Sequence, residues 1–152
     1  MSPFKALPGG RRVALGGVDP VAIFEAAAQA FTDRLVPLAA VEPRRAEELD
    51  VEAPDLDVLL VDFVTELLYR FDTRGWLTRS AEVELREQDD GWALLSTVWG
   101  ERLDLARHRP RGIEVDGARC ERFEPHVRGR RWVAVLAFHQ DDPATTREGG
   151  DE

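Results

Sequence analysis

The sequence predicts an α+β fold, with a mostly antiparallel sheet and two amphipathic helices packed on one face. Two segments repeat apolar residues at three- and four-residue steps, which is the spacing of one helix face. Several shorter segments either alternate apolar and charged residues or are apolar throughout, as strands do. Along the chain these elements run strand, helix, strand, helix and then four strands. This order indicates helices segregated to one face of an antiparallel sheet.

The first strand and the first helix are expected near the N-terminus. Residues 11–15 (RRVAL) form a short strand candidate that ends at a pair of glycines. Asp19 can cap the free N–H groups of a helix, and Pro20 suits the first helical position because its missing N–H would be unpaired there. Arg34, near the expected end, favours the negative end of the helix dipole. The apolar face consists of Ile23, Phe24, Ala27, Ala28 and Phe31.

A charged segment and the second helix follow. Residues 44–52 (RRAEELDVE) alternate only weakly, and we expect an exposed edge strand there. Pro54 and Asp55 open a helix that runs to about residue 72, and Gly75 is placed to end it as a C-cap. The apolar face of this helix consists of Leu56, Leu59, Leu60, Phe63, Leu67 and Phe71.

A hairpin is expected after the second helix. Residues 81–87 (AEVELRE) alternate apolar and charged side chains with period two, with Ala81, Val83 and Leu85 facing inward. The Asp-Asp-Gly sequence at 89–91 is a turn signal that leads into a second strand at 92–99 (WALLSTVW).

The last two strands lie near the C-terminus. One is expected within residues 117–127, and an Arg-Gly-Arg turn at 128–130 leads to the other at 132–138 (WVAVLAF). This run is apolar on both faces, which is typical of a central strand. Residues 141–152 are acidic and contain Gly and Pro, so we expect a disordered tail after a single domain at 1–140.

Composition favours a cytoplasmic protein. Hydrophobic residues make up 43% of the 152 residues and charged residues 32%, which is ordinary for a folded protein. No apolar run approaches the roughly 18 residues that span a bilayer, and the N-terminus lacks the apolar core of a secretory signal. Cys120 is the only cysteine, so it cannot form an internal disulfide. Its simplest role is that of a buried strand residue.

The net charge of −9 argues against autonomous binding to nucleic acid, because the chain as a whole repels phosphate backbones. Local basic patches do occur at 11–12, 44–45, 107–111 and 128–131. Each lies next to a turn, where arginine is often only a solvated loop residue. Local contact with an acidic partner or with RNA is the alternative. The sequence leaves the oligomeric state open.

The chain resembles the archease family, a family of small proteins built on the SHS2 (strand-helix-strand-strand) module. DPVAIFEAAAQAF at 19–31 resembles the first helix of the family, and DLDVLLVDFVTELLY at 55–69 resembles the second. Trp99-Gly100-Glu101, followed by Asp104 and then Arg107-His108, resembles a Gly-Glu…Asp…Arg-His passage of the family. WVAVLAF resembles its last apolar strand, so that the match covers residues 11–140.

The resemblance implies that the chain acts on a protein partner. Archeases assist the RtcB-type RNA ligase by promoting its guanylylation and its multiple turnover in RNA or tRNA splicing and repair, and they are not ligases themselves. The partner-binding residues that we single out are Asp104, Arg107, His108, Arg109 and Arg111. The edge formed by the strand ends near Gly10 and His139 is the second surface.

The chain departs from the family at the positions of its metal site. In the stretch Pro-Gly-Gly-Arg-Arg at 8–12, Gly10 or a neighbour stands where the family has one metal-binding aspartate. His139 stands where the family has another, followed by Gln140 in place of an apolar residue. The family's Lys-Ala-x-Thr-x-His motif corresponds to residues 116–121 (DGARCE), which keep none of its three polar residues. A hard cation such as calcium or magnesium prefers several carboxylate oxygens. We therefore expect no metal and no cofactor, unless the site survives in altered form.

Two alternatives remain open. The chain could be a diverged SHS2 binding module in which both the metal site and the ligase role are lost. A weaker option is a small metal-dependent hydrolase that uses Asp62, Glu66 and His139. For the first two of these residues, a solvated helix face with an ion pair between Glu66 and Arg70 is the plainer interpretation.

Overall fold

The computed structural model of the chain describes residues 2–126 and 129–141, and it confirms the α+β class. In chain order the elements are β1 (Phe4–Ala6), β2 (Arg12–Gly17), α1 (Pro20–Leu35), η1 (Leu38–Ala40), β3 (Arg45–Ala53), α2 (Leu56–Arg74), β4 (Trp76–Gln88), β5 (Gly91–Arg102), α3 (Leu105–His108), β6 (Glu114–Pro125) and β7 (Trp132–Asp141). None of the helices among these residues has the length and apolar character needed to cross a membrane.

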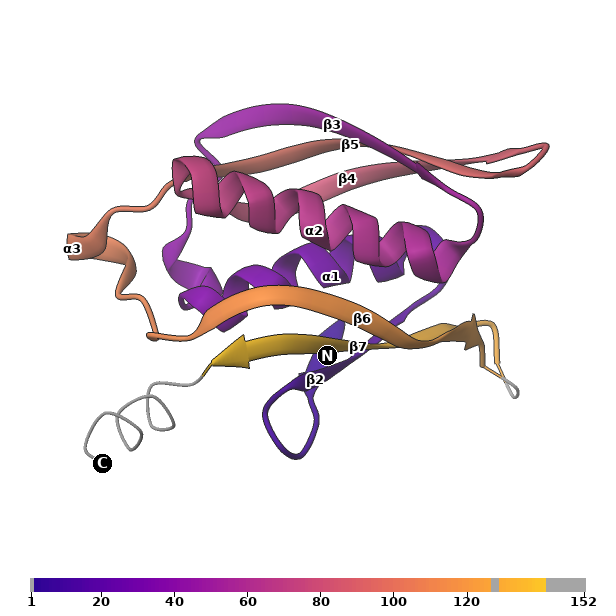
Figure 1. The fold of residues 1–152 in the computed structure, drawn as a ribbon, viewed down its shortest axis with the longest axis horizontal. Coiled ribbons are helices and arrows are strands. Elements are labelled where there is room, and N and C mark those ends of the chain that lie inside the picture. The colour runs from indigo at the N-terminus through magenta and orange to yellow at the C-terminus, as the bar shows by residue number, and fades with distance from the viewer. Residues whose placement is uncertain (1, 127–128, 142–152) are drawn as a thin grey trace.

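The strands form two antiparallel sheets where the sequence led us to expect one. One sheet has the order β1-β2-β7-β6 and the other the order β3-β5-β4. Helices α1 and α2 lie between the two sheets (Figure 1). Each sheet therefore packs one face on the helices, as expected for the single sheet, and leaves its other face to solvent.

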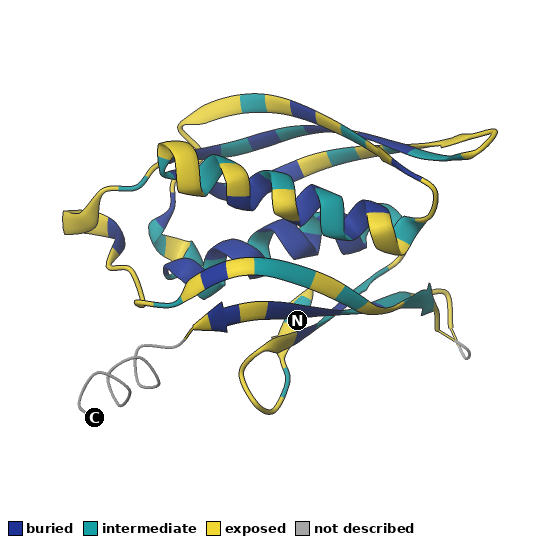
Figure 2. Ribbon diagram, in the orientation of Figure 1, coloured by how far each residue is buried: buried dark blue, intermediate teal, exposed yellow. Residues whose placement is uncertain are grey.

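Helix α1 has no exposed residue, because both sheets pack against it. Asp19 caps it by accepting a hydrogen bond from the N–H of Ala22 at 2.9 Å, as its position before Pro20 predicted. Small residues surround the axis and let both sheets approach closely, as the dark and teal colouring of α1 shows (Figure 2). Its buried residues are Ile23, Phe24, Ala26, Ala27, Ala28, Ala30, Phe31, Thr32 and Leu35.

Helix α2 has a buried face and an exposed face. Asp55 caps its start, and Gly75 ends it in the left-handed conformation at φ 69°, so both predicted ends are confirmed. On the β3 side, Glu47 accepts hydrogen bonds from Arg70 at 2.6 Å and from Arg74 at 2.7 and 2.8 Å. These bonds, with that from Arg74 the largest cause, lower the pKa of Glu47 and tie the last turns of α2 to β3.

Most predicted strands are confirmed, with changes at their ends. β3 is an edge strand and β7 is central, as expected. β4 begins at Trp76, five residues before the predicted start. Its first three residues are all buried, so they lack the alternation on which the prediction was based. β1 has no counterpart in the expectations. Asp141 ends β7 opposite Glu114 and so belongs to the sheet, while residues 142–152 of the predicted tail and 127–128 around the predicted turn lie outside the described residues.

Candidate functional site

The two surfaces that the sequence singles out meet at the C-terminal end of α1, at one end of the molecule (Figure 1). Asp33 and Arg34 are consecutive residues in the last turn of this helix. The carbonyl oxygen of Asp33 accepts a hydrogen bond from Nε of Arg111 at 2.8 Å. Nη1 of Arg34 donates to Oε1 of Gln140 at 3.0 Å and also to the carbonyl oxygen of Gly10. The loop after β5 and the two strand ends therefore lie on two sides of one helical turn.

A buried ionic network supports the loop after β5. Its centre is Glu101, which is 5% exposed. Arg107 donates to both carboxylate oxygens, from Nη2 to Oε1 at 2.5 Å and from Nη1 to Oε2 at 3.1 Å. The N–H of Glu42 donates to Oε2 at 2.8 Å, and Nε2 of the fully buried His108 lies 2.8 Å from the same oxygen. Buried carboxylates are stable only when they are paired in this way.

The hydrogen bonds of the network fix the protonation of its members. The N–H of Asp104 donates to Nδ1 of His108 at 2.7 Å, so the ring proton is on Nε2, which donates to Glu101. Burial raises the pKa of Glu101, but the hydrogen bonds from Arg107, from the Glu42 N–H and from His108 outweigh burial and lower that pKa to about 2. Glu101 is therefore a permanent anion near neutral pH.

The structure places the five predicted partner-binding residues in different environments. Asp104 caps α3, and Arg107 is partly exposed while it pairs with the network. Arg109 and Arg111 are exposed, and Arg109 adopts a left-handed conformation at φ 55°. His108 is fully buried, so its side chain serves the fold and has no surface to offer a partner. Partner contact stays a prediction for the other four.

An open depression of about 580 Å³ lies beside the network. Arginine side chains line it together with Leu103 and Leu105, and Leu105 is 71% exposed. Such a mixture of cations and an exposed apolar side chain is typical of a surface that contacts another protein. The full lining consists of Arg44, Arg45, Glu101, Arg102, Leu103, Asp104, Leu105, Ala106 and Arg107.

The second surface joins the start of β2 to the end of β7. Arg11 donates from Nη1 to the carbonyl oxygen of Gln140, and its own carbonyl accepts from the N–H of Phe138 at 2.7 Å. The guanidinium of Arg34 lies over the Phe138 ring, 4.5 Å from its centroid. His139 is exposed, and its Nδ1 contacts Oδ1 of Asp116 on β6.

The residues at these strand ends do not fit the hard divalent cation that the family resemblance implies. Gly10 offers only its carbonyl oxygen, and both oxygens of Gln140 already accept hydrogen bonds from arginine. His139, a softer nitrogen ligand, is paired with Asp116. Within residues 2–126 and 129–141, no three His, Cys, Asp or Glu side chains are grouped so that they could hold a metal ion.

Sequence reasoning missed the roles of Glu101 and Arg34. Alternation along β5 turns Leu94, Ser96 and Val98 inward and assigns Glu101 to the opposite, outward set, so the sequence pattern gave no signal of its burial. Arg34 was expected only to favour the helix dipole, because its partners are more than 20 and more than 100 residues away in the sequence. A local sequence pattern does not show which distant residues will contact Arg34.

The structure does not assemble the residues considered for a hydrolase. Oε1 of Glu66 lies 3.8 Å from Nε of Arg70 in the same helix, which is the helix-face ion pair considered from the sequence. His139 lies on β7 with Asp116 as its partner. Neither residue joins Asp62 in a metal-binding cluster within the described part of the chain.

Cys120 is half-buried on β6 and packs against the core. Its thiol donates to the carbonyl oxygen of Arg122 at 3.2 Å, and burial raises the pKa of this thiol. A thiol whose pKa is raised is mostly protonated and is a poor nucleophile. The structural role expected for Cys120 agrees with this environment.

The chain matches the model of the archease protein family over residues 12–138. It is 38% identical over 117 residues to the protein archease of Pyrococcus abyssi, which covers 74% of this chain and 80% of that protein. It is 39% identical over 111 residues to the protein archease of Pyrobaculum calidifontis, which covers 72% of this chain and 75% of that protein. Gly10, His139 and Gln140 lie just outside the residues that match the family model.

The fold also occurs among solved structures. The solution structure of Methanobacterium thermoautotrophicum protein 1598 superposes with a TM-score of 0.69 at 21% sequence identity. The superposition covers 91% of this chain and 100% of that chain, so the whole of that fold is present here.

Proposed function

The chain belongs to the archease family, and from this premise we propose that it is an accessory protein that binds and activates an RtcB-type RNA ligase. In this proposal it promotes guanylylation of the ligase and repeated turnover during RNA or tRNA splicing and repair. It acts in the cytoplasm as a protein cofactor, and the chemical steps are those of the ligase.

The observation that carries the proposal is the Glu101 network beneath the loop after β5. Four hydrogen bonds converge on the Glu101 carboxylate from Arg107, His108 and the Glu42 backbone. They hold rigid a loop that presents Leu105 and Arg109 to solvent. A rigid loop loses little conformational entropy on binding, so it suits a surface that docks on a partner.

The charge of the chain supports a protein as the direct partner. Because the chain carries −9, it is repelled by RNA as a whole, and the RNA is then held by the ligase. The arginines around the depression give this end of the molecule local positive charge, which would complement acidic groups on a partner surface.

A turnover assay with the RtcB-type ligase of the same organism tests the proposal. We expect the ligase alone to stop after about one equivalent of product, and the added chain to raise product well beyond that through repeated guanylylation. Leu105→Asp should remove this stimulation, because it puts a charge at the centre of the docking surface. Absence of stimulation by the unmodified chain would contradict the proposal.

Val18 provides a matched control for Leu105. Both side chains are 71% exposed, but Val18 lies before the N-terminus of α1, at the opposite end of the helix from the loop. Val18→Asp should leave stimulation unchanged. If both variants lose stimulation equally, the loss reflects charge or folding and not a docking surface at Leu105.

The diverged binding module without a ligase role is the second candidate. The observation that favours it comes from the strand ends. The metal of the family would need carboxylates there, whereas this chain has arginine donors. Sedimentation or calorimetry with the ligase distinguishes the two functions. The second candidate requires that no complex forms, whereas the first requires one.

A further inference from the structure

Three elements are joined at the strand ends by arginine side chains. The loop before β2 contributes the carbonyl of Gly10, the end of β7 contributes Gln140, and the last turn of α1 contributes Arg34. Nη1 of Arg34 bridges the first two, and Nη1 of Arg11 donates to the carbonyl of Gln140. Two guanidinium groups therefore serve three oxygen acceptors, one on Gly10 and two on Gln140.

Oxygen atoms of this kind are also what a hard cation binds. Calcium and magnesium take carbonyl, amide and carboxylate oxygens, and in proteins most of the attraction comes from carboxylates. Here the carbonyl and amide oxygens are present, but they already accept hydrogen bonds from the guanidinium groups of Arg11 and Arg34. A divalent ion beside them would be repelled by two fixed positive charges.

The position of Arg34 is set by packing as well as by hydrogen bonds. Its guanidinium lies over the face of Phe138, which is 3% exposed, and Gln140 is 5% exposed. Arg34 itself is half-buried, and a cation over an aromatic face is held more firmly than one without a ring partner. The C-terminal end of α1, with its partial negative charge, adds to this preference.

We infer that the guanidinium groups of Arg11 and Arg34 hold the place of the divalent cation in this chain, so that its strand ends are joined without any metal. Arg34 is then a positioning residue that links the Gly10 loop to β7. This inference concerns the isolated protein and does not depend on the proposed ligase partner.

The first test is a metal titration of the unmodified full-length chain. Calcium, magnesium, manganese and zinc are each added up to about 1 mM, a range that covers protein calcium sites, with binding heat and melting temperature as readouts. We expect no saturable heat and a melting temperature that moves by less than about 1 °C between metal and chelator. Saturable binding that stabilises the chain would overturn the inference.

The second test replaces the guanidinium. Arg34→Met keeps much of the side-chain volume and removes the charge and the donors, so amide hydrogen exchange at residues 9–12 and at 138–140 should become about tenfold faster. Arg34→Lys should restore part of the protection because it keeps a cation with donors. Added metal should leave exchange at both segments of the unmodified chain unchanged.

Arg86→Met is the matched control, because Arg86 is exposed on β4 and pairs with Glu84 on the same strand. It should leave exchange at both segments unchanged. If Arg34→Met also leaves exchange there unchanged while the chain stays folded, Arg34 does not join the strand ends and the inference fails.

Discussion

At Glu101, burial and charge oppose each other. Its side chain is 6% exposed and remains anionic because Arg107, His108 and a backbone N–H donate to it. Glu101→Gln removes the negative charge of this side chain, and it therefore leaves the Arg107 guanidinium without its main anionic partner. We expect the variant to lose about 3 kcal/mol of unfolding free energy at pH 7, measured by urea denaturation. Glu84→Gln, an exposed residue paired with Arg86, should lose less than about 0.5 kcal/mol.

The same pair of variants tests the pH dependence of stability. The pKa of Glu101 is lowered from 4.5 to about 2 in the folded state, so its stabilising effect is complete above pH 4.5 and is lost as the pH falls toward 2. The stability difference between Glu84→Gln and Glu101→Gln should therefore shrink over this range. A difference that stays constant from pH 6 to about pH 2.5 would show that Glu101 is not held as an anion.

Local residue patterns predicted the ends of the helices but not these long-range pairs. Asp19, Asp55 and Gly75 act within five residues of their own positions, so sequence spacing was enough to identify them. His108 was expected at a partner surface and is buried instead. Its two ring nitrogens are used by Asp104 and Glu101, a geometry that only the folded loop creates.

At the scale of elements, periodicity predicted which segments are helices and strands but not how many sheets they form. Helix α1 was expected to have one apolar face, yet none of its residues is exposed (Figure 2). Alanine explains the discrepancy, because it is equally compatible with a solvent-facing or a packed position. The run at 26–28 therefore carried no sign that a second sheet covers α1.

Gly100 shows how one position shapes an element. A Cβ at this residue would lie 1.9 Å from the carbonyl oxygen of Leu77, next to the register shift between Thr78 and Ser80. The glycine therefore lets β4 and β5 pair closely just before Glu101. Gly100→Ala should destabilise the chain by about 3 kcal/mol or more in urea denaturation, because backbone on both strands must move.

Gly117 is the matched control for Gly100. It also lies in a strand beside a register shift, but an added Cβ would meet no atom within 4 Å. Gly117→Ala should be neutral or stabilise by about 0.5 kcal/mol, because alanine restricts the unfolded chain. Equal losses in both variants would mean that strand glycines matter here for backbone freedom and not for close approach.

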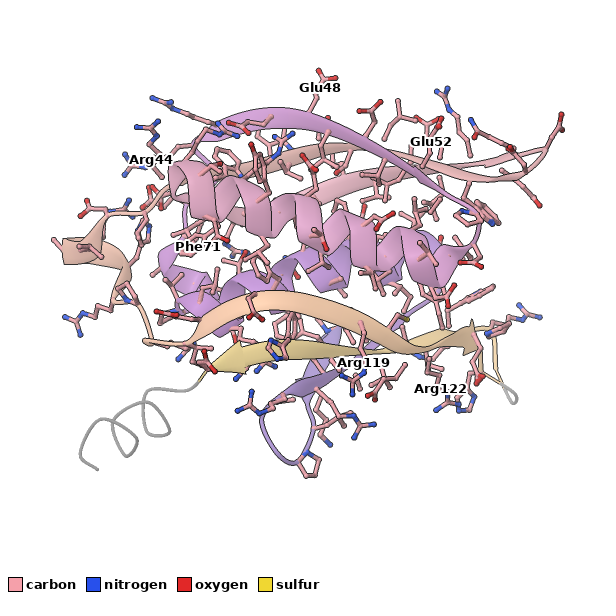
Figure 3. All side chains as sticks on the ribbon, in the orientation of Figure 1. Arg44, Glu48, Glu52, Phe71, Arg119 and Arg122 are labelled. Atoms are coloured by element: carbon pink, nitrogen blue, oxygen red, sulfur yellow. The ribbon has the colours of Figure 1, made fainter. Side chains whose placement is uncertain are left out.

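At the scale of the whole molecule, the negative charge is concentrated away from the candidate site. Strand pairing puts five exposed carboxylates on the outer face of the sheet β3-β5-β4, and Glu48 points away from the helices in Figure 3. The five are Glu48, Asp50, Glu52, Glu82 and Glu84. Arginines instead gather at the C-terminal end of α1 and on the outer face of β6, where Arg119 and Arg122 lie.

The meeting of the two candidate surfaces at α1 could not be read from the sequence. The loop after β5 and the end of β7 are separated by β6, and the start of β2 is about a hundred residues before both. Asp33 and Arg34 bring them together only because α1 lies between the two sheets. The residue types at each surface were predictable, whereas their proximity depends on the two-sheet arrangement.

This charge distribution predicts how the chain finds an acidic partner surface. Arg109→Glu and Arg86→Glu change the net charge by the same amount, since both residues are exposed arginines, but only Arg109 lies at the α1 end. Stopped-flow association with the RtcB-type ligase at low salt should be about tenfold slower for Arg109→Glu and nearly unchanged for Arg86→Glu. The difference should shrink at about 0.5 M salt, because exposed charges are screened. Equal slowing by both variants would show that net charge governs the encounter, and the arginines at the α1 end would then have no special part in docking.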